Sequence, residues 1–427
     1  MRRIRIPAIV RDNLVYLPFF AAVSVLNYSF QVYMARTLAP GHYAALIAAL
    51  SLLAILSSPS AIIANLSART VGTYWSAGSV VRLRHLLARV WVWLGSASVA
   101  LSLIFVALSW PIAEVLSIES MWVVIWAAIA VGPALLSPLL AGMLQGARSF
   151  ALYGAFGAFG AGTRLGIGVL LVGTGFGAAG AMAATPASGF LAIAAGYAGW
   201  RWLMRGRTSD DKENLTIQLP IRGQLQVAAI GAVQILLFNL DILFVKALFD
   251  EQIAADYSAA ALVGRTIFFA VSPLATVLLP NVVHNAVRGE NSLGIFVFSL
   301  SAVIGLCLIG VCVVFLFPDL IYKVVFADVY LPYLDVLRAY ALSGSLLSII
   351  MLLATFHIGV SNLRIWLPMS VLLPLPIVSY TVFNANPGQI AWAMVACLTV
   401  YTIYIAWETL RFAARRGDRE SPPATVG

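Results

Sequence analysis

The stretch VQILLFNLDILFVKALFDEQ, residues 233–252, decides the fold of this chain. It is an apolar run long enough for a membrane-spanning helix, yet Asp241 lies inside it and Lys246 lies near its end. A charged group in hydrocarbon costs several kcal/mol unless it faces protein or water. The stretch therefore predicts a helix in the membrane whose charged residues face other helices or an aqueous cavity.

The composition of the whole chain supports the same class. Of its 427 residues, 61% are hydrophobic and only 10% are charged, whereas soluble domains carry about a quarter charged residues. The three cysteines lie in apolar runs, without the spacing of a metal site or a disulfide framework. The basic N-terminus is followed by an apolar run too long for a signal-peptide core, which predicts a retained first helix. These features exclude a soluble globular protein.

Apolar runs of about 20 to 27 residues recur along the sequence, and each can cross roughly 30 Å of hydrocarbon. We predict an all-α polytopic membrane protein with twelve transmembrane helices. The predicted spans are 13–34, 43–67, 90–110, 120–146, 149–173, 178–200, 223–247, 257–283, 291–318, 333–357, 365–383 and 388–410.

Lysine and arginine residues predict the orientation, because inner loops of membrane proteins are enriched in both. Most of the 26 basic residues fall on one side of the predicted spans, which makes both termini cytoplasmic. Basic inner loops on anionic lipid account for the net charge of +9, so no nucleic-acid partner is expected. The basic segments on this side are the N-terminus, 69–89, Arg148, 201–222, Arg288, Arg364 and 411–419.

The one long polar connection, RGRTSDDKENLTIQLPIR, divides six predicted helices from six. The tail is charged and contains prolines, which predicts disorder. The predicted organisation is an N-terminal bundle (1–204), a cytoplasmic linker (205–222), a C-terminal bundle (223–411) and a disordered tail (412–427).

The two halves also resemble each other in order and spacing. Because six is an even number, duplicated six-helix units share their orientation and are related by an axis along the membrane normal. We therefore expect two pseudo-symmetric bundles around a central cavity, with bends at the matched prolines Pro59 and Pro273. Gln31 matches Asp241, and Arg36 matches Lys246. Tyr43 matches Tyr257, and Pro59 matches Pro273. The segment LLAGMLQG (139–146) matches LLATFHIG (352–359).

Few ionisable residues lie inside the predicted spans, and such residues are candidates for function. Asp241 and Arg265 lie at similar depth on consecutive helices, which allows either a structural ion pair or two cavity-lining groups. Arg164 lies deep in its span, which favours a cavity-facing position over reaching to the interface. Arg36 and Lys246 are matched cations at outer ends, with interfacial anchoring as the alternative.

These charges give the inferred cavity a net positive count, with Asp241 as its one acid. An anionic ligand is therefore expected, and phosphate or pyrophosphate suits the forked donors of arginine. The four histidines form no metal constellation, and no cofactor is expected beyond a proton or sodium ion coupled through Asp241.

Several segments resemble the polysaccharide-transporter branch of the MOP (multidrug/oligosaccharidyl-lipid/polysaccharide) exporter superfamily. They are the segment from NLDILFVKALFDEQ to VLLPNV (239–282), YMARTLAPGHYAAL (33–46), LQGARSFALYG (144–154) and VVFADVYLPYLDVLRAYALSGSLLS (324–348). The resemblance implies a Wzx-type flippase in the bacterial inner membrane, which moves a polyprenyl-pyrophosphate-linked oligosaccharide by alternating access. It also implies cavity roles for Asn239, Asp241, Lys246 and Arg265, and Gln31 occupies the position that matches Asp241 in the first half.

The resemblance further implies a non-enzymatic monomer that contacts membrane lipid and works beside other polysaccharide-assembly proteins. Two alternatives stay open. One is a multidrug or cation exporter of the same superfamily, for which an acidic cavity is expected. The other is a membrane-embedded polysaccharide polymerase or ligase, which would need more than the short outer segment at 318–332.

Overall fold

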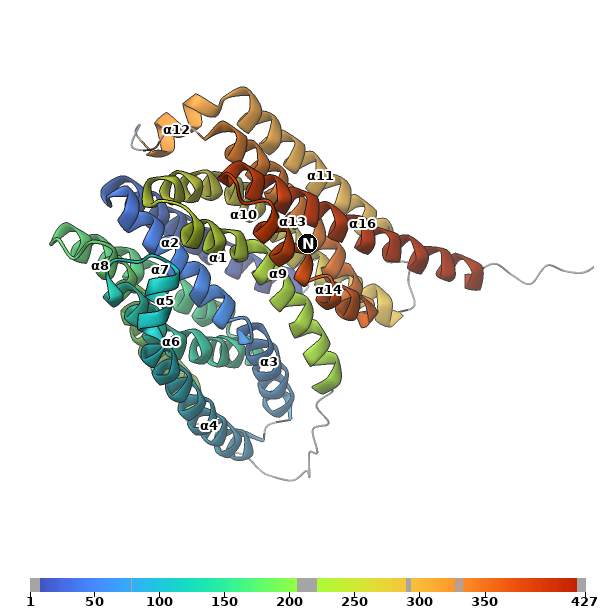
Figure 1. Ribbon diagram of the computed structural model, residues 1–427. Coiled ribbons are helices and arrows are strands. Elements are labelled where there is room, and N and C mark those ends of the chain that lie inside the picture. Colours follow the sequence, from blue (N-terminus) through green and yellow to red (C-terminus); the bar gives the residue numbers. More distant parts are fainter. Residues whose placement is uncertain are drawn as a thin grey trace, which may run out of the picture. The chain divides into compact units, whose positions relative to one another are not determined.

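The computed structural model describes residues 8–77, 79–205, 221–288, 293–326, 330 and 333–420. Within these ranges all regular secondary structure is helical, and Figure 1 shows the helices in chain order. The predicted all-α fold class is confirmed. The chain divides into two compact units, 1–228 and 229–427, which are described separately.

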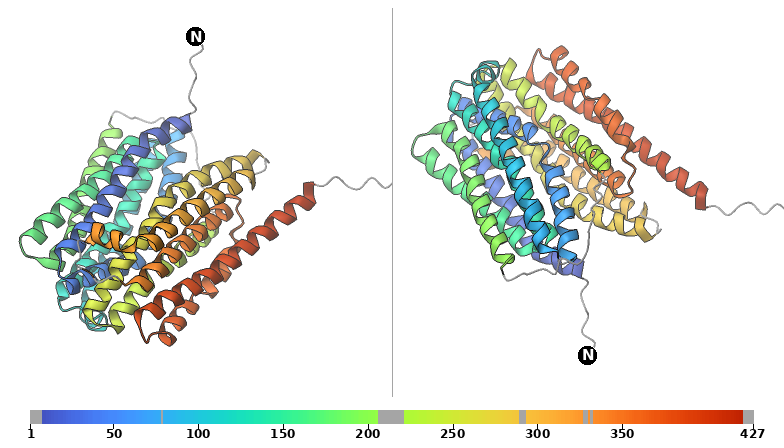
Figure 2. Two further views of the ribbon diagram at one scale, coloured as in Figure 1. Left: turned by 90° about the horizontal axis from the view of Figure 1, so that it is seen from above. Right: turned by 90° about the horizontal axis from the view of Figure 1, so that it is seen from below.

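Helices of the first unit mostly have the length of a membrane span, and they run alongside one another in both views of Figure 2 (blue to green). They are α1 (Ala8–Thr37), α2 (Pro40–Leu56), α3 (Ser60–Ser76), α4 (Val80–Ala107), α5 (Ser109–Val115), α6 (Met121–Gly146), α7 (Phe150–Gly173) and α8 (Gly177–Leu203).

The second unit adds long helices and several short ones. They are α9 (Ile221–Leu248), whose first residues precede the unit boundary, α10 (Glu251–Arg288), α11 (Leu293–Leu316), α12 (Pro318–Phe326), α13 (Leu334–Gly359), the 3₁₀ turn η1 (Leu363–Ile365), α14 (Trp366–Val371), α15 (Pro374–Val382) and α16 (Pro387–Glu420).

Ten helical segments in the described ranges are long and apolar enough to cross a membrane. The pair α2 and α3 adds an eleventh span if its 46° bend is counted within one crossing. The remaining predicted span, 13–34, falls on α1, a helix of 30 residues with polar side chains such as Asn27 and Gln31. Each predicted span thus coincides with helical structure.

Proline acts differently at the two matched positions. The bend between α2 and α3 lies at Ser57–Pro59, where the first matched proline was expected to bend the chain. In contrast, α10 is one helix from Glu251 to Arg288 and runs through Pro273. Helices in membranes tolerate proline where neighbouring groups satisfy the freed backbone. Pro133 and Pro138 inside α6 are further examples.

The predicted span 365–383 is helical but broken into η1, α14 and α15. Pro374 is in the first turn of α15. A proline at that position lacks only an N–H that would find no partner in the helix. Proline therefore starts a new helix here instead of continuing the previous one.

The structure describes the start of the predicted tail but little of the predicted linker. Most of the predicted linker, residues 206–220, lies outside the described residues. The tail predicted to be disordered from residue 412 does not begin there, because α16 continues to Glu420. Its last turns are rich in alanine and arginine, which have high helix propensity, so the helix extends beyond its apolar part.

Glycine allows close helix packing in both units. A Cβ atom added at Gly142 or Gly146 of α6 would overlap the backbone carbonyl oxygens of Ala64 and Ala68 on α3. In the second unit, a Cβ atom at Gly344 of α13 would overlap the carbonyl oxygen of Gly264 on α10. Small residues permit such close contact in membranes. This packing brings α13 against α10 at the level of the site described next.

Candidate functional site

Asp241 of α9 is the centre of a buried polar cluster in the second unit. Its side chain is 0% exposed. Its Oδ2 atom accepts a hydrogen bond of 3.0 Å from Tyr257 of α10 and a second from Tyr340 of α13. The rings of Tyr257 and Tyr340 meet edge to face, with centroids 5.3 Å apart. One carboxylate therefore joins three helices.

The other carboxylate oxygen of Asp241, Oδ1, differs from Oδ2. Oδ1 is buried and has no hydrogen-bond partner in the described structure. A buried carboxylate with an unsatisfied oxygen carries a large desolvation cost, which a proton or a cation would remove. The arrangement can therefore bind a proton or a small cation at Oδ1 while the tyrosines hold Oδ2.

Arg265 of α10 does not form the ion pair with Asp241 that similar depth allowed. Its guanidinium donates to the backbone carbonyl of Phe238 and lies over the Phe238 ring, 4.3 Å from the ring centroid. Arg265 is still close enough to act electrostatically on Asp241. Other hydrogen bonds take the place of the ion pair. Two tyrosine hydroxyls donate to Oδ2 of Asp241, and the guanidinium of Arg265 donates to a backbone carbonyl. The Nε atom of Arg265 is buried and has no hydrogen-bond partner among the described residues.

Lys246, at the end of α9, is 1% exposed and forms an ion pair with Glu251 of α10. Its Nζ atom lies 3.4 Å from Oε1 of Glu251. Glu251 belongs to the segment FDEQ (249–252), which has no counterpart in the first half of the repeat. The carboxylate offsets the lysine charge, so Lys246 contributes less positive charge than the sequence analysis assumed.

Asp256 is a second buried acid that the sequence analysis missed. It is 3% exposed, and the side-chain amide of Gln252 donates to its Oδ1 atom at 3.2 Å. Burial, with the negative charge of Asp256 nearby, raises the pKa of Tyr330. Asp256 directly precedes Tyr257, which matches Tyr43 in the internal repeat. This position in the sequence could have identified Asp256 as a candidate residue. The second unit is therefore more acidic inside than predicted.

Asn239 is 6% exposed, and its amide nitrogen donates to the backbone carbonyl of Ile235 at 2.8 Å. This donor is committed to the helix to which Asn239 belongs. Its predicted role in substrate binding stays a prediction.

In the first unit, Arg164 of α7 lies over Phe30 of α1, with its Cζ atom 4.1 Å from the ring centroid. Its Nε and Nη2 atoms are buried and have no hydrogen-bond partner in the described structure. Gln31, the residue after Phe30 on α1, has a buried Oε1 atom with no hydrogen-bond partner in the part of the chain that the structure describes. Arg164 and Gln31 thus offer donors and an acceptor that the fold leaves uncommitted. Arg36 is exposed in the last turn of α1, where a cation suits the helix dipole.

The repeat gives the two units different chemistry at matched positions. Gln31 in the first unit matches Asp241 in the second, and the buried residue Tyr43 matches Tyr257. An amide cannot change its charge, whereas a carboxylate can. The ionisable centre therefore belongs to the second unit. In the described ranges, no group of three or more histidine, cysteine, aspartate or glutamate residues is arranged to hold a metal ion.

The sequence matches no protein-family model, and no curated protein matches it significantly. Solved structures do match. A multidrug resistance MATE family transporter of the MOP superfamily, in an inward-facing conformation, has a TM-score of 0.72 at 13% identity, covering 96% of this chain and 99% of that chain. An outward-facing structure of such a transporter has a TM-score of 0.61 at 16% identity, covering 97% of both chains.

A eukaryotic MATE transporter is similar as well, with a TM-score of 0.66 and 13% identity, covering 94% of this chain and 95% of its own. At 13–16% sequence identity, these similarities show the fold of this chain and nothing further. This chain has the helical fold of the MATE transporters of the MOP superfamily.

Proposed function

We propose that this chain is a membrane transporter that works by alternating access. The observation that carries the proposal is the likeness to both inward-facing and outward-facing MATE structures over nearly the full length of the chain. We further propose a multi-pass protein of a bacterial inner membrane with both termini in the cytoplasm. The concentration of arginine and lysine on one side of the predicted spans supports this orientation.

Small organic molecules, including cations, are the first substrate class that we propose. The likeness to multidrug resistance transporters supports it. The charges of the second unit support it too, because Asp241 and Asp256 are buried acids and Glu251 offsets Lys246. The net positive cavity expected from the sequence argued against this class, and these contacts weaken that argument.

In this proposal Asp241 is the coupling residue. A proton or cation at Oδ1 removes the cost of the buried charge and favours one conformation, and its release favours the other. A ligand shifts such an equilibrium only through its different affinity for the two states. Tyr257 and Tyr340 carry the change to α10 and α13, because both donate to the same carboxylate.

A lipid-linked oligosaccharide is the second candidate substrate. The specific observation in its favour is Arg164, whose Nε and Nη2 atoms have no hydrogen-bond partner among the described residues. Arginine binds pyrophosphate through paired donors. The segments that resemble the polysaccharide branch support the same substrate. In this case the headgroup would cross through protein while the polyprenyl tail stays in lipid.

Reconstitution into proteoliposomes distinguishes the two substrates. The first assay follows efflux of a fluorescent organic cation under an imposed proton or sodium gradient. The second follows flipping of a fluorescent polyprenyl-pyrophosphate-linked oligosaccharide. Gradient-dependent cation transport that is lost in Asp241→Asn and retained in Arg164→Gln supports the first proposal. Oligosaccharide flipping that is lost in Arg164→Gln supports the second, and movement of neither substrate would overturn both.

A further inference from the structure

The first unit contains a cavity that plays no part in the proposed transport cycle. It lies where the first turns of α4 and the last turns of α8 meet beside α6, and its volume is about 840 Å³. Ligand-binding cavities commonly have volumes of about 300–1,000 Å³. The space is therefore large enough for the headgroup of a lipid and the part of an acyl chain next to it.

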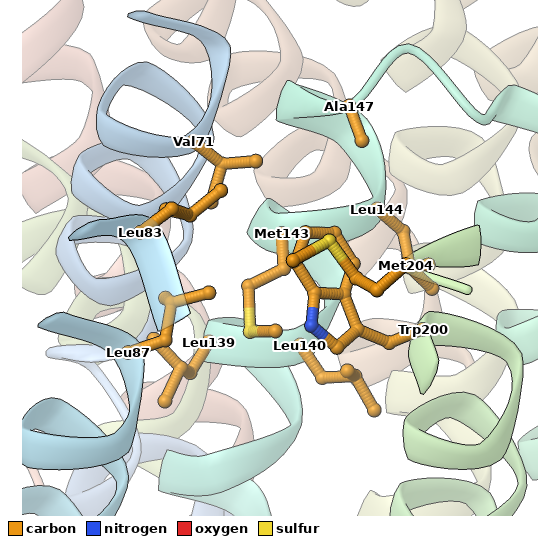
Figure 3. Packing of buried hydrophobic residues seen from close by; sticks show 10 residues of the cluster. All are labelled: Val71, Leu83, Leu87, Leu139, Leu140, Met143, Leu144, Ala147, Trp200 and Met204. Atoms are coloured by element: carbon orange, nitrogen blue, oxygen red, sulfur yellow. The ribbon is translucent and has the colours of Figure 1, made fainter. Parts of the chain in front are cut away.

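The floor of the cavity is apolar and tightly packed. Leu87, Met143, Trp200 and Met204 line it, and all four are nearly fully buried. They belong to the hydrophobic cluster drawn in Figure 3, in which the side chains of Met143, Trp200 and Met204 lie beside one another. Residues from α4, α6 and α8 thus form a rigid surface for hydrocarbon.

The rim of the cavity is cationic. Arg84, Arg201 and Arg205 line it, and no aspartate or glutamate is among the described residues that line the cavity. Arg84 donates from Nη2 to the backbone carbonyl of Met204 at 3.3 Å, which holds its guanidinium against the end of α8. None of the three arginines pairs with a carboxylate in the described ranges. The rim therefore presents three positive charges to one ligand.

Aromatic side chains form the wall between the floor and the rim. Phe190 and Tyr197 are 49% and 46% exposed, and Trp91 meets Tyr197 edge to face with ring centroids 6.1 Å apart. The indole Nε1 atom of Trp91 is buried and has no acceptor in the described structure. A buried donor without a partner beside a cationic rim indicates a ligand with oxygen acceptors.

We propose that this cavity binds one anionic phospholipid. The phosphate is held by the rim arginines, an ester oxygen accepts from Trp91, and one acyl chain lies along the aromatic wall over the apolar floor. Basic pockets between transmembrane helices are suited to anionic headgroups. A soluble anion would leave the wall and floor unused. The site does not depend on which substrate the protein carries.

A cavity in the second unit provides an internal comparison. Its volume is about 620 Å³, and Arg364 and Arg411 line it together with Glu408. Glu408 lies 3.9 Å from Arg411, so its carboxylate offsets part of the positive charge. We therefore expect the phospholipid in the first unit and not in the second.

Native mass spectrometry of the purified full-length protein tests the proposal. Phosphatidylglycerol is titrated in detergent, with phosphatidylcholine as the uncharged comparison. We expect one phosphatidylglycerol per chain at saturation. The variant Arg84→Gln/Arg201→Gln should weaken this binding by about 30-fold, which corresponds to about 2 kcal/mol. The matched control Arg82→Gln/Arg89→Gln removes two charges from α4 outside the cavity and should change the affinity by less than about threefold.

A second variant tests the cavity without changing its charge. Ala194 lines the cavity and is exposed, so Ala194→Trp fills the space and should abolish stoichiometric binding. Equal losses in the two arginine variants would overturn the proposal in favour of diffuse surface attraction. Equal binding of phosphatidylcholine would overturn it as well. Displacement by millimolar inorganic phosphate would identify an anion site, and displacement by equimolar polyprenyl phosphate a carrier-lipid site; either outcome overturns the phospholipid.

Discussion

Tyr257 of α10 donates a hydrogen bond of 3.0 Å to the Oδ2 atom of Asp241 on α9, and both side chains are buried. Tyr340 of α13 donates to the same atom. Two consecutive helices and a third that is distant in sequence therefore depend on one carboxylate. A change in its charge acts on all three, which is the property that a coupling residue needs.

Asp241→Asn should abolish cation-coupled transport and leave the protein folded. The asparagine carbonyl can accept from both tyrosines, but it cannot exchange a proton or bind a cation by charge. The variant Asp241→Ala leaves two buried hydroxyls unpaired and should lower the free energy of unfolding by about 1–3 kcal/mol. Thermal unfolding in detergent and proteoliposome transport measure the two effects. An asparagine variant with wild-type coupling would remove Asp241 from the mechanism.

Arg164→Met should fold as well as the wild type or better. Methionine keeps most of the volume against Phe30 and removes a cation whose Nε and Nη2 atoms have no hydrogen-bond partner within the described ranges. Replacing such a group by an apolar one is often neutral or stabilising. If Arg164 binds an anionic substrate, binding of a pyrophosphate-bearing lipid is lost in the variant. The control is Arg89→Met, at an exposed position of α4. A variant that unfolds would show that the arginine is structural.

Gly142→Ala should destabilise the first unit even though alanine favours helices. The added Cβ atom would overlap the carbonyl oxygen of Ala64, so α6 must move away from α3. On the same helix, a Cβ atom at Gly132 meets only ordinary contacts, the nearest to Ser102 at 3.6 Å. Gly132→Ala should therefore be neutral or stabilising by up to about 1 kcal/mol. Melting temperatures in one detergent compare the two variants, and equal shifts would refute the close-packing argument.

His357 and Thr409 should couple α13 to α16. The Thr409 hydroxyl donates to the backbone carbonyl of Ile405 at 2.8 Å, so it must accept from Nε2 of His357 at 2.9 Å. Nδ1 then accepts from Asn362 at 3.1 Å. Thr409→Val keeps the shape and removes the acceptor, which should cost about 1 kcal/mol.

Thr402→Val is the matched control on α16, because among the described residues the Thr402 hydroxyl bonds only to the backbone carbonyl of Leu398. Thermal unfolding should distinguish the two variants. A double-mutant cycle with His357→Leu would show no coupling energy if the histidine and the threonine acted independently.

The sequence by itself predicted the membrane class, the positions of the helices and the internal repeat. These features depend on hydrophobic run length and on spacing, which are local properties of a chain in lipid. It also selected Asp241, Arg164 and Arg265, because ionisable residues in apolar runs are rare. Their isolation in the sequence was sufficient to identify them.

Only the tertiary structure decided what these charges contact. Whether Asp241 meets Arg265 or two tyrosines depends on how α9, α10 and α13 pack, and Tyr340 lies far from Asp241 in the sequence. The close approach of α10 and α13 at Gly264 and Gly344 leaves no room for a Cβ atom, and no periodicity in the sequence encodes it. Hydrophobicity determines which segments can cross the membrane. The packing of side chains between helices determines which buried charged groups keep atoms that can bind a ligand.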